Sequence, residues 1–180
     1  ADNHFQNMPL YLFGHSMGGY AVSAVLQFGH HIDKVISASG FDTPQEQWQY
    51  SIKRYTGVFY PIIQPLNTLF INLQYGNDKA LSAIDGINSV TTPVLIISAE
   101  DDVFYGGYSP LYSHQNEIVN PNCAFVLMNE ENHNGHYNYF LSDAALLYQA
   151  SNPSVPINKA LYMEHDENIM NMLVKFLEDK

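Results

Sequence analysis

Basic side chains are scarce in this sequence, which has seven Lys and Arg residues against 18 Asp and Glu residues. The formal net charge is −11 at pH 7 with the histidines neutral. Nucleic-acid binding requires a basic surface, and anionic lipid surfaces attract basic segments. The charge therefore argues against both classes of partner.

Long hydrophobic runs are absent as well. No apolar run reaches the ~20 residues of a membrane-spanning helix, and the first residues, ADNHFQNMP, have neither the basic nor the apolar segment of a secretory signal. We expect no membrane span, and the cytoplasm is the expected compartment. At 180 residues and 46% hydrophobic, the chain is long enough for one domain with its own core.

Cys123 is the single cysteine, which excludes a disulfide within the chain. It lies in an apolar, strand-like run, where we expect buried packing rather than reactivity. No Cys/His pattern has zinc spacing, and the adjacent His30 and His31 cannot converge on one ion. We expect no metal and no organic cofactor.

The most informative stretch is residues 9–29, PLYLFGHSMGGYAVSAVLQFG. The apolar run from Leu10 to Phe13 predicts a buried strand, and residues 20–28 have the composition of a buried helix. Between them lies a G-x-S-x-G sequence centred on Ser16, on the predicted strand-to-helix turn. Such a turn holds a serine in strained geometry with its hydroxyl at the carboxyl end of the strand.

The glycines on either side of this serine have an expected steric role. A Cβ at Gly14 or at Gly18 should crowd the turn. The first N–H groups of the new helix must also stay free to face an oxyanion. The alternative is a glycine-rich turn on which Ser16 only caps the helix.

The stretch PLYLFGHSMGGYAV resembles the nucleophile elbow of the alpha/beta-hydrolase superfamily, in its esterase, lipase and lysophospholipase-like branch. The INSVTTPVLIISAEDD block and a closing amphipathic helix over 166–176 are similar to a bacterial subgroup, so the resemblance covers nearly the whole chain. It implies an α/β fold, a mostly parallel sheet flanked by helices, and a triad in the order Ser, Asp or Glu, His. It also implies that the N–H of Met17 is an oxyanion donor.

The resemblance directs the search for the acid to the strand predicted over 92–97. This strand ends in Ser98-Ala99-Glu100-Asp101-Asp102. The family pattern places a small residue three positions before the acid, which Ala99 and Asp102 match. Asp101 is the alternative and Glu100 a weaker one. The other interpretation is that these acids are simply solvated groups at the end of a strand.

The base is expected on the loop after the last predicted strand, at 122–128. His133 has the loop distance usual for compact members of the family. His136 follows a glycine, as in the family's Gly-His, and precedes a Ser/Thr-x-x-Ala sequence at 142–145. We favour His136 and keep His133 as the alternative.

An aromatic, proline-interrupted insertion at 42–88 follows the strand predicted over 32–41. It predicts two or three short helices, and in this superfamily an insertion here commonly forms a cap over the active site. The alternative is a helical layer with a small core of its own. The expected substrate contacts are aromatic and histidine side chains of the cap and the strand ends: His15, Trp48, Phe59, Phe70 and Phe104.

Only about nine residues precede the first predicted strand, where the superfamily places several strands and helices. The sequence therefore predicts one domain, residues 1–180, that forms the C-terminal portion of the fold. We expect the front strands to come from the same or a separate chain and to supply the second oxyanion donor. A homo-oligomer is a further option.

Together these features predict a serine hydrolase that cleaves a small-molecule carboxylic ester with a small to medium apolar acyl group. Ser16 would be the nucleophile, His136 the base and Asp102 the acid. A peptidase or thioesterase could use the same triad. A non-catalytic half-domain that pairs with a separate N-terminal chain is the alternative outside enzymes.

Overall fold

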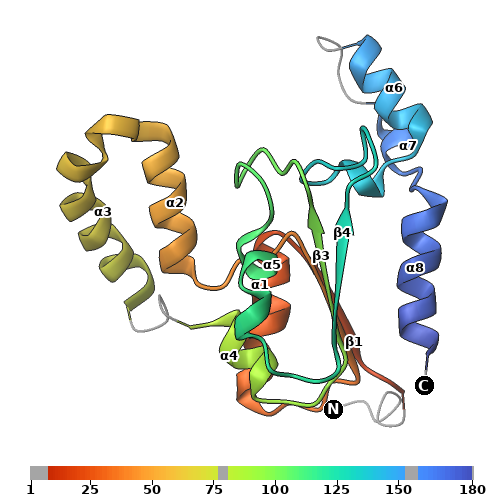
Figure 1. The fold of residues 1–180 in the computed structure, drawn as a ribbon, viewed down its shortest axis with the longest axis horizontal. Helices are drawn as coiled ribbons and strands as arrows, with labels where there is room; N and C mark the ends of the chain where they lie inside the picture. The colour runs from red at the N-terminus through yellow and green to blue at the C-terminus, as the bar shows by residue number, and fades with distance from the viewer. Residues whose placement is uncertain (1–7, 77–80, 153–157, 180) are drawn as a thin grey trace.

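Four parallel strands form the centre of the molecule (Figure 1). The computed structural model describes residues 8–76, 81–152 and 158–179. In this part of the chain the strands lie in sequence order, and each neighbouring pair is parallel. All four predicted strands are found, with small shifts of their ends: β1 (Tyr11–His15), β2 (Lys34–Ala38), β3 (Val94–Ala99) and β4 (Cys123–Met128). The prediction that the first of them is buried is wrong, because Tyr11 and Phe13 of β1 are about half exposed.

The strands are apolar on both faces because helices cover both. All six residues of β3 are buried, as expected for a central strand of a parallel sheet. Side chains alternate between the faces, so Val35 packs in one cluster with Ile87, whereas Ile36 packs in the other with Ile169. The result is a three-layer arrangement whose strands all end at one edge.

One face is covered by α1 (Met17–Ala24), α4 (Ala83–Asn88) and α5 (Pro110–Ser113), and the other by α8 (Glu167–Glu178) (Figure 1). The 3-10 turn η2 (Val25–Phe28) continues α1 and ends at Gly29, whose φ of 70° suits glycine. The closing helix α8 begins after Asp166, whose carboxylate accepts from the N–H groups of Asn168 and Ile169.

The predicted insertion divides into two parts. Its first part is a helical hairpin of α2 (Pro44–Thr56) and α3 (Tyr60–Tyr75), joined by η3 (Gly57–Phe59). Its end, α4, instead packs closely against α1. The two helices are so near each other that a Cβ on Gly86 would lie 2.2 Å from the carbonyl oxygen of Ser23. Since α4 is part of the main helical layer, only the hairpin remains as a candidate cap.

The hairpin stands beside the main helical layer, on the side away from α8 (Figure 1). Its first helix, α2, begins after Thr43, whose side-chain oxygen accepts from the N–H of Glu46 at 3.1 Å. Polar side chains connect it to the rest of the chain. The Tyr50 hydroxyl donates to the carbonyl oxygen of Tyr105, and His114 Nε2 lies 3.3 Å from Glu46 Oε1. That the hairpin caps a substrate site stays a prediction.

The Ser109-Pro110 pair is typical of a helix start and predicts a helix that ends near Ile118, with Ser109 as its cap. The observed helix is shorter and consists of α5 and the 3-10 turn η5 (Gln115–Glu117). The Ser109 side chain makes no capping bond, so that part of the prediction is wrong. The Ser109 N–H donates to Ser98 Oγ at 2.8 Å, and its buried hydroxyl has no protein partner. Burial turns this serine toward β3 rather than toward the first turn of the helix.

The remaining chain after β4 runs through η6 (Asn138–Phe140), α6 (Asp143–Ser151) and α7 (Lys159–Tyr162). The prolines at positions 153 and 156 predict a loop at 150–158, and residues 153–157 of it lie outside the described part of the chain. Within the described ranges, no helix has the length and apolar character needed to cross a membrane. Among the same residues, His, Cys, Asp and Glu side chains form no group of three or more that could hold a metal ion. Burial raises the pKa of the Cys123 thiol to about 12, so the thiol stays protonated at neutral pH.

Candidate active site

Ser16 lies on the turn between β1 and α1, at the carboxyl edge of the sheet. Its φ of 56° and ψ of −115° fall in a region that residues with a side chain rarely adopt. Its N–H donates to the carbonyl oxygen of Ala38 at 2.8 Å, which anchors the strained backbone to the end of β2. The side chain makes no capping bond to α1, so the alternative that Ser16 only caps the helix is wrong.

The tight glycines of this turn are not the two that the motif suggests. A Cβ on Gly14 would lie 2.1 Å from the carbonyl oxygen of Gly18, as expected. A Cβ on Gly18, however, would meet nothing within 4 Å, so the predicted crowding at Gly18 is wrong. The second tight position is Gly19, where a Cβ would lie 2.9 Å from the carbonyl oxygen of Ala38. The turn is therefore tight at Gly14, which lies against the start of α1, and at Gly19, which lies against the end of β2.

Gly14→Ala is expected to destabilise the fold by about 3 kcal/mol or more, because the methyl group collides with backbone that cannot move aside. Gly18→Ala is the matched control. It should be neutral or slightly stabilising, by up to about 1 kcal/mol, since alanine is the better helix former and the space is open. Urea unfolding of both variants measures the difference, and similar losses in the two would contradict this account of the turn.

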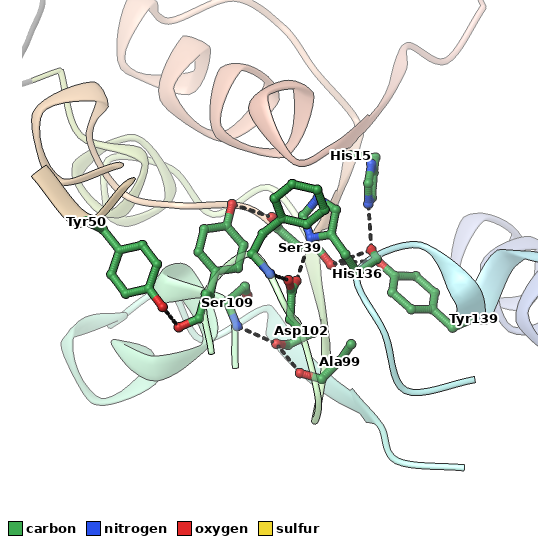
Figure 2. Close-up of polar contacts among 11 residues, drawn as sticks. His15, Ser39, Tyr50, Ala99, Asp102, Ser109, His136 and Tyr139 are labelled. Carbon is green, nitrogen blue, oxygen red and sulfur yellow. Dashed lines mark hydrogen bonds and ion pairs between the residues drawn. The ribbon is translucent and has the colours of Figure 1, made fainter. Parts of the chain in front are cut away.

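A short polar contact at this edge joins Asp102 and His136 (Figure 2). Asp102 Oδ2 lies 2.6 Å from His136 Nδ1, and both side chains are buried. Asp102 Oδ1 accepts from the N–H of Phe104 at 2.9 Å. A buried carboxylate with its two oxygens satisfied in this way orients an imidazole so that its other nitrogen, Nε2, can accept a proton.

The local backbone explains why Asp102 is the acid that turns inward. Its carbonyl oxygen accepts from the N–H groups of Tyr105, Gly106 and Gly107, which folds residues 102–107 into a tight turn after β3. The side chains of Glu100 and Asp101 are exposed. The backbone N–H of Asp101 donates to the carbonyl oxygen of Asn134 at 2.9 Å, so this residue joins the two loops only through the main chain.

His133 has a different partner. Its Nε2 lies 2.9 Å from Oδ1 of Asp143, the first residue of α6, whose side chain is exposed. The structure thus brings His136 to Asp102 and His133 to Asp143. Because a carboxylate that faces water orients an imidazole less firmly than a buried one, the geometry favours His136 as the base.

Tyr105, which the sequence did not indicate, packs against this pair. It is buried, its hydroxyl donates to the carbonyl oxygen of Ser39 at 3.3 Å, and its ring centroid lies 5.7 Å from that of His136. Burial raises the pKa of this hydroxyl well above its ordinary value, although the nearby Ser16 side chain acts in the opposite direction. The hydroxyl therefore stays protonated. The only sequence signal was an aromatic residue three positions after Asp102.

The carbonyl oxygen of His136 is also bonded by side chains from elsewhere (Figure 2). It accepts from His15 Nε2 at 2.8 Å and from Ser39 Oγ at 3.2 Å. Burial lowers the pKa of His15 below its ordinary value, more than the bond to His136 raises it. His15 is therefore neutral at neutral pH, with its proton on Nε2, and this nitrogen is engaged with the main chain rather than free for a substrate.

The other predicted substrate contacts lie in two places. The ring of Phe104 lies 4.5 Å from that of His136 and is half exposed, so it borders the site. Trp48 and Phe70 pack on each other inside the hairpin, with ring centroids 5.3 Å apart, and Phe59 is exposed in the turn between α2 and α3. A substrate role for these four residues stays a prediction.

Met17 is the first residue of α1, and its side chain is exposed. The first N–H groups of a helix have no partner within the helix and carry its positive end. The position after Ser16 therefore suits the predicted oxyanion donor, which also stays a prediction.

No family model and no curated protein matches this chain. Among solved structures, it is similar to an esterase of Pyrococcus furiosus with a TM-score of 0.56 and 15% identity, over 97% of this chain and 57% of that one. A Staphylococcus aureus protein of unknown function gives 0.54 and 18%, over 97% of this chain and 66% of that one. An acylaminoacyl peptidase in complex with a chloromethyl ketone gives 0.51 and 13%, over 92% and 26%.

The chain thus spans little more than half the length of the esterase. At these identities the likeness concerns the fold. The parallel sheet in sequence order, the helices on both faces and the strained serine between β1 and α1 agree with it. The described part of the chain therefore has the alpha/beta-hydrolase fold.

Proposed function

We propose that this chain carries the catalytic groups of a serine hydrolase that cleaves carboxylic esters. The observation that supports the proposal most is the buried contact of 2.6 Å between Asp102 and His136, at the same sheet edge as the strained Ser16. A structural ion pair would not need a serine in this backbone conformation beside it.

The reaction is acyl transfer to water through an acyl-serine intermediate. Ser16 Oγ attacks the ester carbonyl while His136 Nε2 takes its proton. His136 then protonates the leaving alcohol, and Asp102 holds the proton on Nδ1 and stabilises the imidazolium. The N–H of Met17 donates to the developing oxyanion, a contribution of about 3 kcal/mol for one such donor. Water repeats the sequence on the acyl-enzyme.

The substrate we propose is a neutral ester with a small to medium apolar acyl group. Phe104 borders the site, and residues 47–77 contain no carboxylate and only two basic residues, Lys53 and Arg54. Aromatic side chains favour apolar groups over charged ones. Hydrolysis rates of aryl esters across acyl lengths test this, and a preference for acetyl or charged acyl groups would count against it.

A peptidase is the second candidate, because an acylaminoacyl peptidase is among the structures of similar fold. The same three residues would cleave an amide or a thioester. Comparing an aryl ester, an aminoacyl anilide and an acyl thioester on the same preparation separates the three activities. We expect the ester to be the best substrate.

Further strands beside β1 remain part of the proposal. Leu10, Tyr11 and Phe13 are about half exposed at the free edge of the sheet described here. An apolar strand edge favours pairing with another strand. Strands from the same or another chain would cover it and bring the second oxyanion donor.

Ser16 should react with a fluorophosphonate to give a single adduct, seen by intact mass, and Ser16→Ala should give none. Activation of the serine requires the neighbouring base, so the adduct reports an assembled site. Ser113→Ala is the control, since the Ser113 hydroxyl is bonded to the carbonyl oxygen of Ser109 within α5. An adduct that survives in Ser16→Ala, or none on the folded parent protein, would sink the proposal.

A further inference from the structure

His15 joins the turn of the serine to the loop of the histidine. Its Nε2 donates to the carbonyl oxygen of His136 at 2.8 Å, and the two rings meet edge to face with centroids 4.7 Å apart. Its own backbone is fixed in the sheet, where His15 pairs with Ala38 of β2. Because Ser16 is the next residue, one side chain spans from the nucleophile's strand to the main chain of the base.

A second group of side chains holds the same carbonyl oxygen. Ser39 Oγ donates to it at 3.2 Å, and Tyr139 Oη lies 2.8 Å from Ser39 Oγ. The single Ser39 hydroxyl proton is used on the carbonyl, so Tyr139 must donate to Ser39. Ser39 and Tyr139 are fully buried. Buried polar groups that are all satisfied in this way form a rigid network.

His136 is therefore held at two points. Asp102 fixes its imidazole at Nδ1, and His15 with Ser39 fixes its main-chain carbonyl oxygen. With both fixed, the direction of Nε2 relative to the backbone of Ser16 follows. An imidazole tethered only by Asp102 could still swing about that one bond.

We propose that His15 is a positioning residue whose Nε2–H, donated to the carbonyl oxygen of His136, sets the distance between the nucleophile's turn and the base. This inference rests on the proposed function, because it assigns a role within that site. It replaces the predicted contact of His15 with substrate. Displacements of about 1 Å in a catalytic group can cost about 100-fold in rate.

Three substitutions separate the hydrogen bond from the ring. His15→Gln places an amide N–H where Nε2 was, His15→Asn places one near Nδ1, out of reach, and His15→Met has no donor. We expect His15→Asn and His15→Met to lower kcat for an aryl ester, and the rate of fluorophosphonate labelling, by about 10- to 100-fold with KM unchanged. His15→Gln should recover to within about threefold of the parent protein.

A spectroscopic measurement distinguishes positioning from mere stability. In the parent protein, the proton between His136 Nδ1 and Asp102 should give a downfield ¹H signal, which ¹⁵N-histidine labelling assigns. We expect this signal to broaden or move upfield in His15→Met and His15→Asn, and to return in His15→Gln. The Gln and Asn variants differ by one methylene, so this pair decides the matter even if His15→Met does not fold.

Two results would overturn the inference. One is a loss of thermal stability in His15→Met and His15→Asn with unchanged kcat and an unchanged downfield signal, which would make His15 a structural residue only. The other is a His15→Gln variant as impaired as His15→Asn, which would mean that the donor at Nε2 is not what matters. A parent protein that is never labelled at Ser16 contradicts the proposed function instead, and the downfield signal then still decides whether His15 positions His136.

Discussion

His136→Asn is expected to lower kcat/KM for an aryl ester by on the order of 10⁵-fold, because it removes the imidazole proposed to take the proton of Ser16. Asparagine is chosen because its amide nitrogen lies where Nδ1 was and can still donate to Asp102. Removing that donor would leave a buried carboxylate unpaired and could unfold the protein. Steady-state hydrolysis, with thermal unfolding measured alongside, separates loss of the base from loss of the fold.

His133→Asn is the matched control for this prediction. His133 is as buried as His136, but its partner is the exposed Asp143. We expect less than about a tenfold change in kcat/KM, since neither Ser16 nor Asp102 loses a partner. If the larger loss occurred in His133→Asn, the base would be His133, and the contact between His136 and Asp102 would be structural.

Asp102→Asn should lower kcat by on the order of 10⁴-fold while leaving the backbone in place. The amide can still accept from the N–H of Phe104, but its NH₂ group would now face His136 Nδ1. The imidazole would then carry its proton on Nε2 and could not accept one from Ser16. The pH dependence of kcat, measured on a folded variant, checks that the loss is not a shift of the optimum.

Asp101→Asn provides the comparison for the acid. Its side chain is exposed, and its backbone bond to Asn134 does not involve the carboxylate. The expected change is within about threefold, as for other surface substitutions. Equal losses in Asp101→Asn and Asp102→Asn would remove the reason for assigning the acid to either residue.

The sequence was sufficient for the sheet because each strand is a local pattern. Val94 to Ile97 form an unbroken apolar run, as expected for a strand covered on both faces, and all six residues of β3 are buried. The turn at Ser16 was equally local, since strand, glycines, serine and helix lie within one short stretch. The order of candidate acid and base along the chain came from the resemblance, and the structure brings the favoured pair together.

What the sequence missed depends on contacts between distant residues. His15 and His136 are 121 positions apart, and no periodicity indicates that a side chain of one bonds the main chain of the other. Gly19 rather than Gly18 is tight because β2 passes beside it. The position of α4 could not be predicted for the same reason. Its sequence continues the insertion, and only its packing on α1 shows that it belongs to the main helical layer.

The all-parallel order of the sheet has a consequence for how the protein folds. Parallel neighbours are joined by long crossovers, so every contact between strand ends closes a large loop before it stabilises anything. Chains dominated by such non-local contacts reach their final structure slowly. Ser16 and its helix can form early, whereas the loops of Asp102 and His136 meet only when β3 and β4 have docked. If the proposed roles hold, an unfinished chain would carry Ser16 without His136 beside it and would be inactive until the sheet is assembled.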